Sequence, residues 1–221
     1  MSGQNETARP ITAVHLLVAL ALFIMAQPLI DDLRYRVFVD AVLLTAVLVS
    51  ALLAVGARGR DLVYSAVLIT PAVAGKWAAG IWPDRVPQEI YLIAGMLFIA
   101  YVSSHLLRHV LQTKRVTMEL LCAAVSNYLL FGVLCSFAYL CIARFKPGAF
   151  AFTSGPPGQA LDSFSALYFS FTTLSTAAYG DILPVARPAR MLAYVESIAG
   201  LFYMATLVAR LVALYSSGKK S

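Results

Sequence analysis

The stretch FSALYFSFTTLSTAAYGD, residues 164–181, decides the fold of this chain. Its first part, Phe164 to Leu174, is apolar and aromatic but too short to cross a bilayer, because a crossing helix takes about 20 residues. Asp162 and Ser163 precede it and suit a helix N-cap. We expect a short helix that dips into the membrane and returns as extended chain. Non-helical backbone is tolerated at membrane depth only where it lines a watery or protein-walled cavity, so the stretch predicts a pore.

Long apolar segments lie on both sides of this stretch. Of the 221 residues, 60% are hydrophobic and 13% are charged, and the mean hydropathy is +0.78. A soluble domain has about a quarter charged residues, so the composition predicts an all-α membrane protein and argues against a soluble enzyme. We predict six transmembrane helices in addition to the re-entrant helix, over residues 11–30, 37–57, 62–82, 89–108, 117–142 and 188–216.

The excess of basic over acidic residues in the chain does not indicate a nucleic-acid partner. The formal net charge is +6, but Lys and Arg are scattered at the ends of the apolar segments and form no patch in the sequence. The three cysteines, Cys122, Cys135 and Cys141, lie in one apolar segment without metal-ligand spacing. The sequence contains no nucleotide-binding loop, nucleophile elbow or catalytic carboxylate pair, so we predict no enzyme activity and no cofactor.

Residues 175–181, Ser-Thr-Ala-Ala-Tyr-Gly-Asp, resemble the potassium-channel signature Thr-Val-Gly-Tyr-Gly-Asp. The resemblance covers about residues 117–216, with an outer helix, a Pro/Gly-rich turret at 143–160, a pore helix with Tyr168 and Phe169 at its aromatic pair, the filter and an inner helix. The chain thus resembles the bacterial six-transmembrane potassium channels. This resemblance implies six transmembrane helices, a re-entrant pore helix and a selectivity-filter loop, with four chains around one axis.

In that family, backbone carbonyls of four filter strands replace the hydration shell of the ion. The resemblance implies that the ligands here are the Thr176 hydroxyl and the carbonyls of Thr176, Ala177, Ala178 and Tyr179, with Gly180 completing the filter. The residues expected to support the filter are Tyr168, Thr172, Ser175, Asp181 and Glu196. The permeant ion is expected to be K⁺ or another monovalent cation.

The filter departs from the family pattern at Ala178, which replaces the first filter glycine, and at Ala177, which replaces the valine. A row of carbonyls facing one way requires alternating backbone handedness, and an L-alanine held in the left-handed conformation costs about 1–2 kcal/mol. We therefore expect the strand to relax around Ala178. The filter should then hold fewer ions, keep the site at Thr176, and give low or poorly selective flux.

The last apolar segment carries three further candidates. Gly200 lies twenty residues after Gly180, where the family has its inner-helix hinge, and close helix packing is an equal alternative. The residues below it recur at helical spacing and could line a cavity or gate, or simply pack: Leu201, Ala205, Val208 and Val212. Glu196, a carboxyl group inside the span, is either a functional site or a hydrogen-bond partner for the back of the pore helix, and we favour the second.

The first four segments lack the pattern of a voltage sensor. We assign residues 1–110 to a four-helix, sensor-like membrane domain and residues 111–221 to the pore domain. A voltage sensor needs several intramembrane arginines, whereas the fourth segment offers only Arg108 at its end. Asp40 and Lys76 are expected to form an ion pair or to extend to the interface. The pore is therefore not expected to be voltage-gated in the usual way.

The most favoured function is a potassium-channel-like, tetrameric cation pore in the cytoplasmic membrane, in contact with lipids and with both termini in the cytoplasm. Lys and Arg are almost equally divided between the two sides, so the orientation is based on the resemblance and on the charge near the linker between the fourth and fifth segments. The alternative is a weakly selective or non-conducting channel homologue that acts as a membrane sensor or scaffold.

Overall fold

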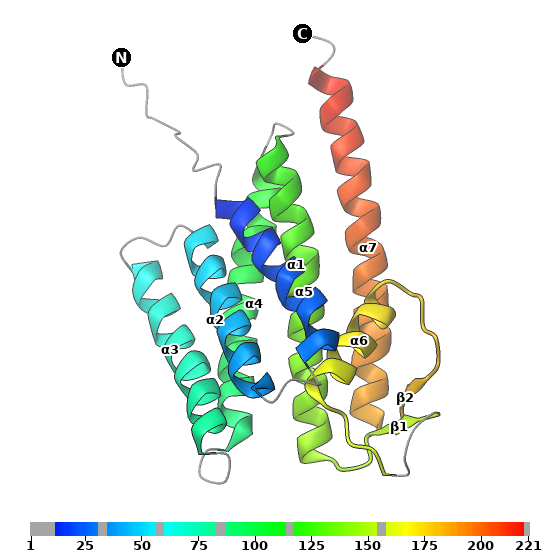
Figure 1. The fold of residues 1–221 in the computed structure, drawn as a ribbon. Coiled ribbons are helices and arrows are strands. Elements are labelled where there is room, and N and C mark those ends of the chain that lie inside the picture. The colour runs from blue at the N-terminus through cyan, green and yellow to red at the C-terminus, as the bar shows by residue number, and fades with distance from the viewer. Residues whose placement is uncertain are drawn as a thin grey trace.

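The computed structural model describes residues 12–30, 35–55, 60–82, 87–113, 117–153 and 158–218. Within them the chain forms a helical bundle with one short strand pair (Figure 1). The elements in order are α1 (Thr12–Ile30), α2 (Arg36–Val55), α3 (Arg60–Ile81), α4 (Gln88–Gln112), α5 (Met118–Phe145), β1 (Phe150–Phe152), α6 (Ser163–Leu174), β2 (Ile182–Pro184) and α7 (Arg187–Gly218).

Five of the six expected spans are confirmed as helices long and apolar enough to cross a membrane: α1, α2, α4, α5 and α7. The third expected span, 62–82, is also helical, as α3. Its described apolar part, Ser65–Ile81, falls below the spanning length, so the crossing of α3 stays a prediction. Pro188 lies in the first turn of α7, where proline is tolerated because the first helical N–H groups have no intrahelical partner.

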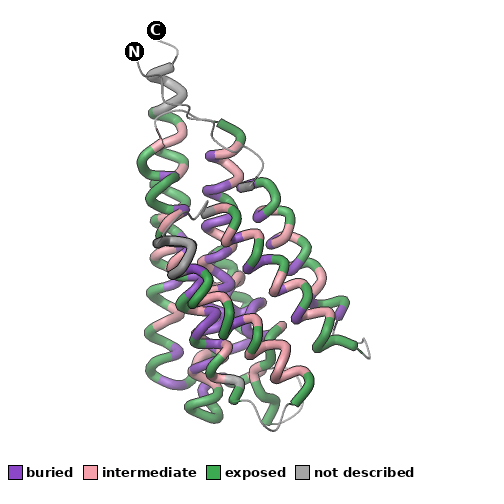
Figure 2. Tube along the Cα trace, turned by 90° about the vertical axis from the view of Figure 1, so that its left-hand side faces the viewer, coloured by how far each residue is buried: buried purple, intermediate pink, exposed green. Residues whose placement is uncertain are grey.

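Helix α5 forms the centre of the bundle, where it packs against α1, α4, α6 and α7. Within one chain 61% of its span is buried, whereas only 11% of the α7 span is buried. Figure 2 shows the same contrast, because buried residues gather inside the bundle and the outer helix faces stay exposed. The α7 helix therefore presents most of its surface to something outside its own chain.

The expected re-entrant helix is α6, which packs against α5 and α7 in the half of the bundle where α7 begins. Its first turn is capped as expected, because the Asp162 carboxylate accepts a hydrogen bond of 2.7 Å from the Ser165 N–H. With 12 residues, α6 is too short to span a bilayer. The chain returns from it without regular structure over residues 177–179.

The all-α fold class is confirmed, and two short strands of three residues each, which were not expected, are added to the helices. The β1 strand from the turret pairs antiparallel with β2, which follows the filter, and Phe150 lies opposite Pro184. Beyond the pair, the Thr153 N–H donates to the Asp181 carbonyl at 2.9 Å. Strands of three residues carry too little periodicity to be recognised in a Pro/Gly-rich turret. They hold the chain that leaves the filter.

The start of α1 and the end of α7 lie at the same end of the bundle (Figure 1), as expected for the six predicted crossings. Helix α4 runs to Gln112 and α5 begins at Met118, so the connection is short and α4 packs on the α5 of its own chain. Several of the basic residues used for the orientation, among them Arg58, Lys114 and Lys219, lie outside the described residues. The domain boundary near residue 110 stays a prediction.

Candidate functional site

The backbone after α6 alternates in handedness. Thr176, Ala178 and Gly180 have φ angles of +61°, +42° and +79°, whereas Ala177 and Tyr179, which lie between them, are not in the left-handed region. This alternation is what a row of carbonyls facing one way requires, and it is rare because only glycine adopts a positive φ without strain. The sequence 176–180 therefore has the local geometry of a carbonyl-lined strand.

The expectation that the strand relaxes at Ala178 is wrong for its backbone. The Ala178 N–H donates to the Thr172 carbonyl at 3.1 Å, and the Thr176 N–H donates to the Thr173 carbonyl at 3.0 Å. Both acceptors belong to the last turn of α6, whose carbonyls have no intrahelical partner. The strand is thus hydrogen-bonded to α6 at one end and to Thr153 at the other. These hydrogen bonds keep Ala178 in the left-handed conformation, although that conformation costs an L-alanine about 1–2 kcal/mol.

The left-handed conformation of Thr176 could not be foreseen from the sequence. A β-branched residue at positive φ is a genuine outlier, because its branched side chain crowds the backbone. Such strain persists only where surrounding contacts impose it, and it concentrates at functional sites. The resemblance assigned ligand oxygens to Thr176 but carried no information on its backbone.

Tyr168 and Asp181 meet at the outer end of the strand, as expected for filter support. The rings of Tyr168 and Tyr179 are stacked, with centroids 6.4 Å apart and planes 12° apart. Asp181 raises the pKa of the Tyr168 phenol through a side-chain hydrogen bond. The Asp181 carboxylate also accepts from the Ile182 N–H at 3.1 Å, so this one residue connects α6 to the first residue of β2.

Thr172 contacts the strand through its backbone rather than its side chain, and the Ser175 hydroxyl contacts Thr172 in the last turn of α6. The Thr172 hydroxyl donates to the Phe169 carbonyl within α6 at 3.0 Å. The Thr172 backbone carbonyl accepts the hydrogen bond from the Ala178 N–H, and the Ser175 hydroxyl lies 3.4 Å from the same carbonyl oxygen. A side-chain substitution at Thr172 would therefore leave the contact with Ala178 in place.

Glu196 is completely buried and joins three helices. The Tyr139 hydroxyl of α5 lies 2.5 Å from its Oε2, and the Ser170 hydroxyl of α6 lies 2.5 Å from its Oε1. The hydrogen bond to the back of the pore helix is thus confirmed. The sequence interpretation missed Tyr139 and Ser170, although polar groups inside apolar helices were the available signal. Tyr139 also makes edge contacts with the Phe150 and Phe169 rings, at 5.7 and 4.9 Å.

Gly200 is buried where α7 crosses the end of the pore helix. A Cβ atom added to it would lie 2.4 Å from the Leu174 carbonyl oxygen and 2.7 Å from the Leu174 Cδ1. The Tyr128 hydroxyl of α5 donates to the same carbonyl at 3.2 Å. Of the two alternatives for Gly200, close packing therefore has a direct structural cause, and the hinge stays a prediction.

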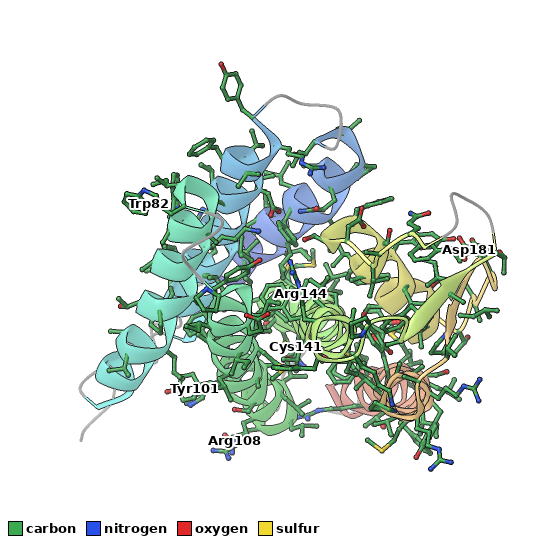
Figure 3. All side chains as sticks on the ribbon, turned by 90° about the horizontal axis from the view of Figure 1, so that it is seen from below. Trp82, Tyr101, Arg108, Cys141, Arg144 and Asp181 are labelled. Carbon is green, nitrogen blue, oxygen red and sulfur yellow. The ribbon has the colours of Figure 1, made fainter. Side chains whose placement is uncertain are left out.

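The face of the chain that carries the filter is open in the isolated subunit. Residues 175–180 are all exposed, and so are the candidate gate residues of α7, Leu201, Ala205, Val208 and Val212. Asp181, at the end of the filter, and Trp82, after α3, lie on opposite sides of the molecule (Figure 3). The end of the exposed strand thus lies on the side of the molecule opposite the end of α3.

An ion pair lies among helices α1–α4, at the end of these helices that faces the start of α6. Lys76 and Asp40 are 2.5 Å apart, as expected, and Gln27 donates to the other Asp40 oxygen at 2.8 Å. A cavity of about 330 Å³ beside them is also lined by Asp162 and Ser163. Among the described residues no group of three or more His, Cys, Asp or Glu is arranged to hold a metal ion.

Residues 127–217 match a protein-family model described as an ion channel. The matched region runs from the first half of α5 through α6 and the strand to the end of α7, and thus contains all the contacts of residues 176–181 described above. No similar curated protein and no similar solved structure was found. The match supports an ion channel, which is a membrane protein without enzyme activity.

Proposed function

We propose that four copies of this chain form a potassium-channel-like cation pore with residues Thr176 to Gly180 as its selectivity filter. The observation that carries the proposal is the alternating handedness at Thr176, Ala178 and Gly180, directly after a re-entrant helix in a region that matches an ion-channel family. The Thr176 hydroxyl and the four carbonyls from Thr176 to Tyr179 replace the hydration shell of K⁺ or another monovalent cation. The negative end of the α6 dipole favours a cation beneath them.

The exposed strand is the reason for several chains, and the resemblance to potassium channels gives their number as four. Backbone groups of residues 175–180 face outward in the single subunit, and such groups cannot face lipid because nothing there accepts their hydrogen bonds. One strand supplies one side of a ring, so a closed ring requires several copies around an axis. The poorly buried α7 gives each copy an apolar surface to place against its neighbours or toward the cavity.

Support and gating belong to the residues around the strand. Tyr168 and Asp181 support the outer end of the strand, and the Thr172 carbonyl accepts a hydrogen bond from Ala178. Ser175 connects α6 to the strand, and Glu196 accepts a hydrogen bond from Ser170 of the pore helix. In the tetramer, Gly200 is the close helix contact or the hinge below the filter. The exposed apolar face of α7 lines the inner cavity or gate, and its residues there are Leu201, Ala205, Val208 and Val212. The protein lies in the cytoplasmic membrane with both termini in the cytoplasm.

The pore is not voltage-gated in the usual way. Arg108, near the end of α4, is the only arginine in that helix, so moving α4 through the field transfers little charge. Each elementary charge contributes about 2.3 kcal/mol per 100 mV, and steep voltage dependence takes several of them in each subunit. The stimulus for gating therefore lies elsewhere in the protein or its lipids.

Gly180→Ala tests the filter assignment in reconstituted vesicles. The alanine meets no atom within 4 Å but is forced to a φ of +79°, which costs about 1 kcal/mol in each subunit. We expect uptake of rubidium and potassium to fall at least about tenfold, because the summed cost of four subunits exceeds the 1.4 kcal/mol that corresponds to tenfold. The measurement is uptake of potassium, rubidium and sodium under an imposed gradient.

Gly148→Ala is the matched control. Gly148 has a φ of +76°, also has no atom within 4 Å of an added Cβ, and lies in the turret before β1. The same backbone cost therefore arises outside the filter, and we expect potassium uptake to stay within about twofold of the wild type. Equal losses in the two variants would argue against a filter at 176–180.

The second candidate function, a weakly selective or non-conducting channel homologue that serves as a sensor or scaffold, is favoured by the same strand. Thr176 and Ala178 carry strain that glycine would not, and the small Ala177 offers little packing behind the carbonyls. An intact wild-type tetramer whose potassium uptake equals that of protein-free vesicles would support this candidate over a conducting pore.

A further inference from the structure

The hydrogen bonds around Glu196 do not balance if its carboxyl group is ionised. The Ser170 hydroxyl lies 2.7 Å from the Gly132 carbonyl oxygen and 2.5 Å from the Glu196 Oε1. A serine hydroxyl has one hydrogen, and both neighbours are acceptors when the carboxyl is ionised. One of the two short contacts would then join oxygen atoms with no hydrogen between them. Such a contact is repulsive at these distances.

One proton on the carboxyl satisfies every contact. The Glu196 O–H then donates to the Ser170 oxygen, the Ser170 O–H donates to the Gly132 carbonyl, and the Tyr139 O–H donates to the other carboxyl oxygen. The result is one chain of hydrogen bonds through α7, α6 and α5, in which each group has a partner.

The surroundings agree with a neutral group. Glu196 has no exposed surface, and the described titratable groups that interact with it are the Tyr139 hydroxyl, the Cys135 thiol and the Tyr128 hydroxyl, all from α5. From α6 it meets the Ser170 hydroxyl, so none of these described contacts is a cation that would stabilise a carboxylate. A buried charge without a partner is neutralised at far lower cost than it is kept.

We propose that Glu196 binds a proton at neutral pH and, as the neutral acid, positions the pore helix against α5 and α7. Removing the proton leaves Ser170 with two acceptors for one hydrogen. The Ser170 hydroxyl then loses its hydrogen bond to either the Gly132 carbonyl of α5 or the Glu196 carboxylate of α7. In each case the contact of α6 with one neighbouring helix is weakened. Because the filter strand follows the C-terminal end of α6, shortly after Ser170, the proton acts as a ligand that keeps the strand in place. Only the effect on ion flux rests on the proposed function.

The direction of the pH effect follows from the proton count. The native protein binds one proton at Glu196 that a solvated glutamate releases at neutral pH. Since the unfolded state then binds fewer protons than the native state, stability decreases as the pH rises and Glu196 ionises. We expect both thermal stability and ion flux of the wild type to decline at alkaline pH, and the decline to be smaller in Glu196→Gln, whose amide cannot lose a proton.

The test combines infrared spectroscopy with flux on the full-length protein in vesicles. We expect the wild type at pH 7 to show the C=O stretch of a protonated carboxylic acid, and Glu196→Gln to lack this band. Glu196→Gln should keep flux within about twofold of the wild type, because its amide donates to Ser170 and accepts from Tyr139. Glu196→Ala leaves both hydroxyls without their partner and should lose flux at least about tenfold.

Glu119→Gln, the same change in the first turn of α5, is the control and should keep the band. A wild type without the band at pH 7, or a Glu196→Gln protein as damaged as Glu196→Ala, would overturn the proposal. If the band depends on Glu196 while neither wild type nor variants conduct, the proposed function is wrong and the protonated Glu196 stands.

Discussion

Gly200→Ala is expected to reduce ion flux at least about tenfold and to weaken the tetramer. The added methyl carbon would lie 2.4 Å from the Leu174 carbonyl oxygen. This oxygen is a backbone atom, so the clash cannot be relieved by rotation of a side chain. Overpacking of this kind costs about 1–3 kcal/mol, and more where the backbone must move. Because Leu174 is the last residue of α6, relief of the clash moves α7 or the start of the filter strand. Thermal unfolding and rubidium uptake on the same preparation measure both effects.

Gly80→Ala provides the matched control in α3. There the added carbon meets one side-chain atom, the Val37 Cγ1, at 3.0 Å, and valine can shift by the few tenths of an ångström required. Alanine also favours the helix over glycine by about 1 kcal/mol. We expect unchanged flux and equal or higher stability. A Gly200→Ala protein with wild-type flux and stability would show that α7 does not depend on this close contact.

Ala178→Val is expected to have the second large effect. Ala178 is held at a φ of +42°, where a β-branched side chain is strongly disfavoured, so valine adds about 1 kcal/mol or more of strain in each subunit. Summed over a tetramer, this strain should displace the carbonyls and lower potassium uptake at least about tenfold, since 1.4 kcal/mol corresponds to tenfold. Uptake of potassium and sodium on reconstituted protein measures both the loss and any change in selectivity.

Ala177→Val is the control, because the same side chain is introduced one residue away, outside the left-handed region. Its flux should stay within about twofold of the wild type. Ala178→Gly should move in the opposite direction and stabilise the strand, since glycine adopts this φ without strain. If the two valine variants lose flux equally, the handedness of the strand does not control conduction.

The helices were the most predictable part of the protein. Apolar length alone placed α6 at 164–174, one residue from its observed start, and predicted the five confirmed spans to within a few residues. The filter strand was located by its resemblance to a known signature. These features are local in sequence, so hydropathy and motif spacing suffice to find them.

The contacts that hold the strand could not be predicted, because they join residues far apart in the chain. Thr153 reaches Asp181, Tyr139 reaches Glu196, and Gly200 meets Leu174. The mistaken expectation for Ala178 has the same cause. Local backbone energetics favour relaxation, but hydrogen bonds to the end of α6 hold the residue in its strained conformation.

An electron cryo-microscopy map of the protein in lipid nanodiscs with potassium would show whether four copies of this strand surround a cation path. We expect a fourfold ring in which residues 176–180 line the axis, with ion density between the carbonyls from Thr176 to Tyr179. A particle without a fourfold axis, or a ring whose axis is empty beside these carbonyls, would contradict this expectation.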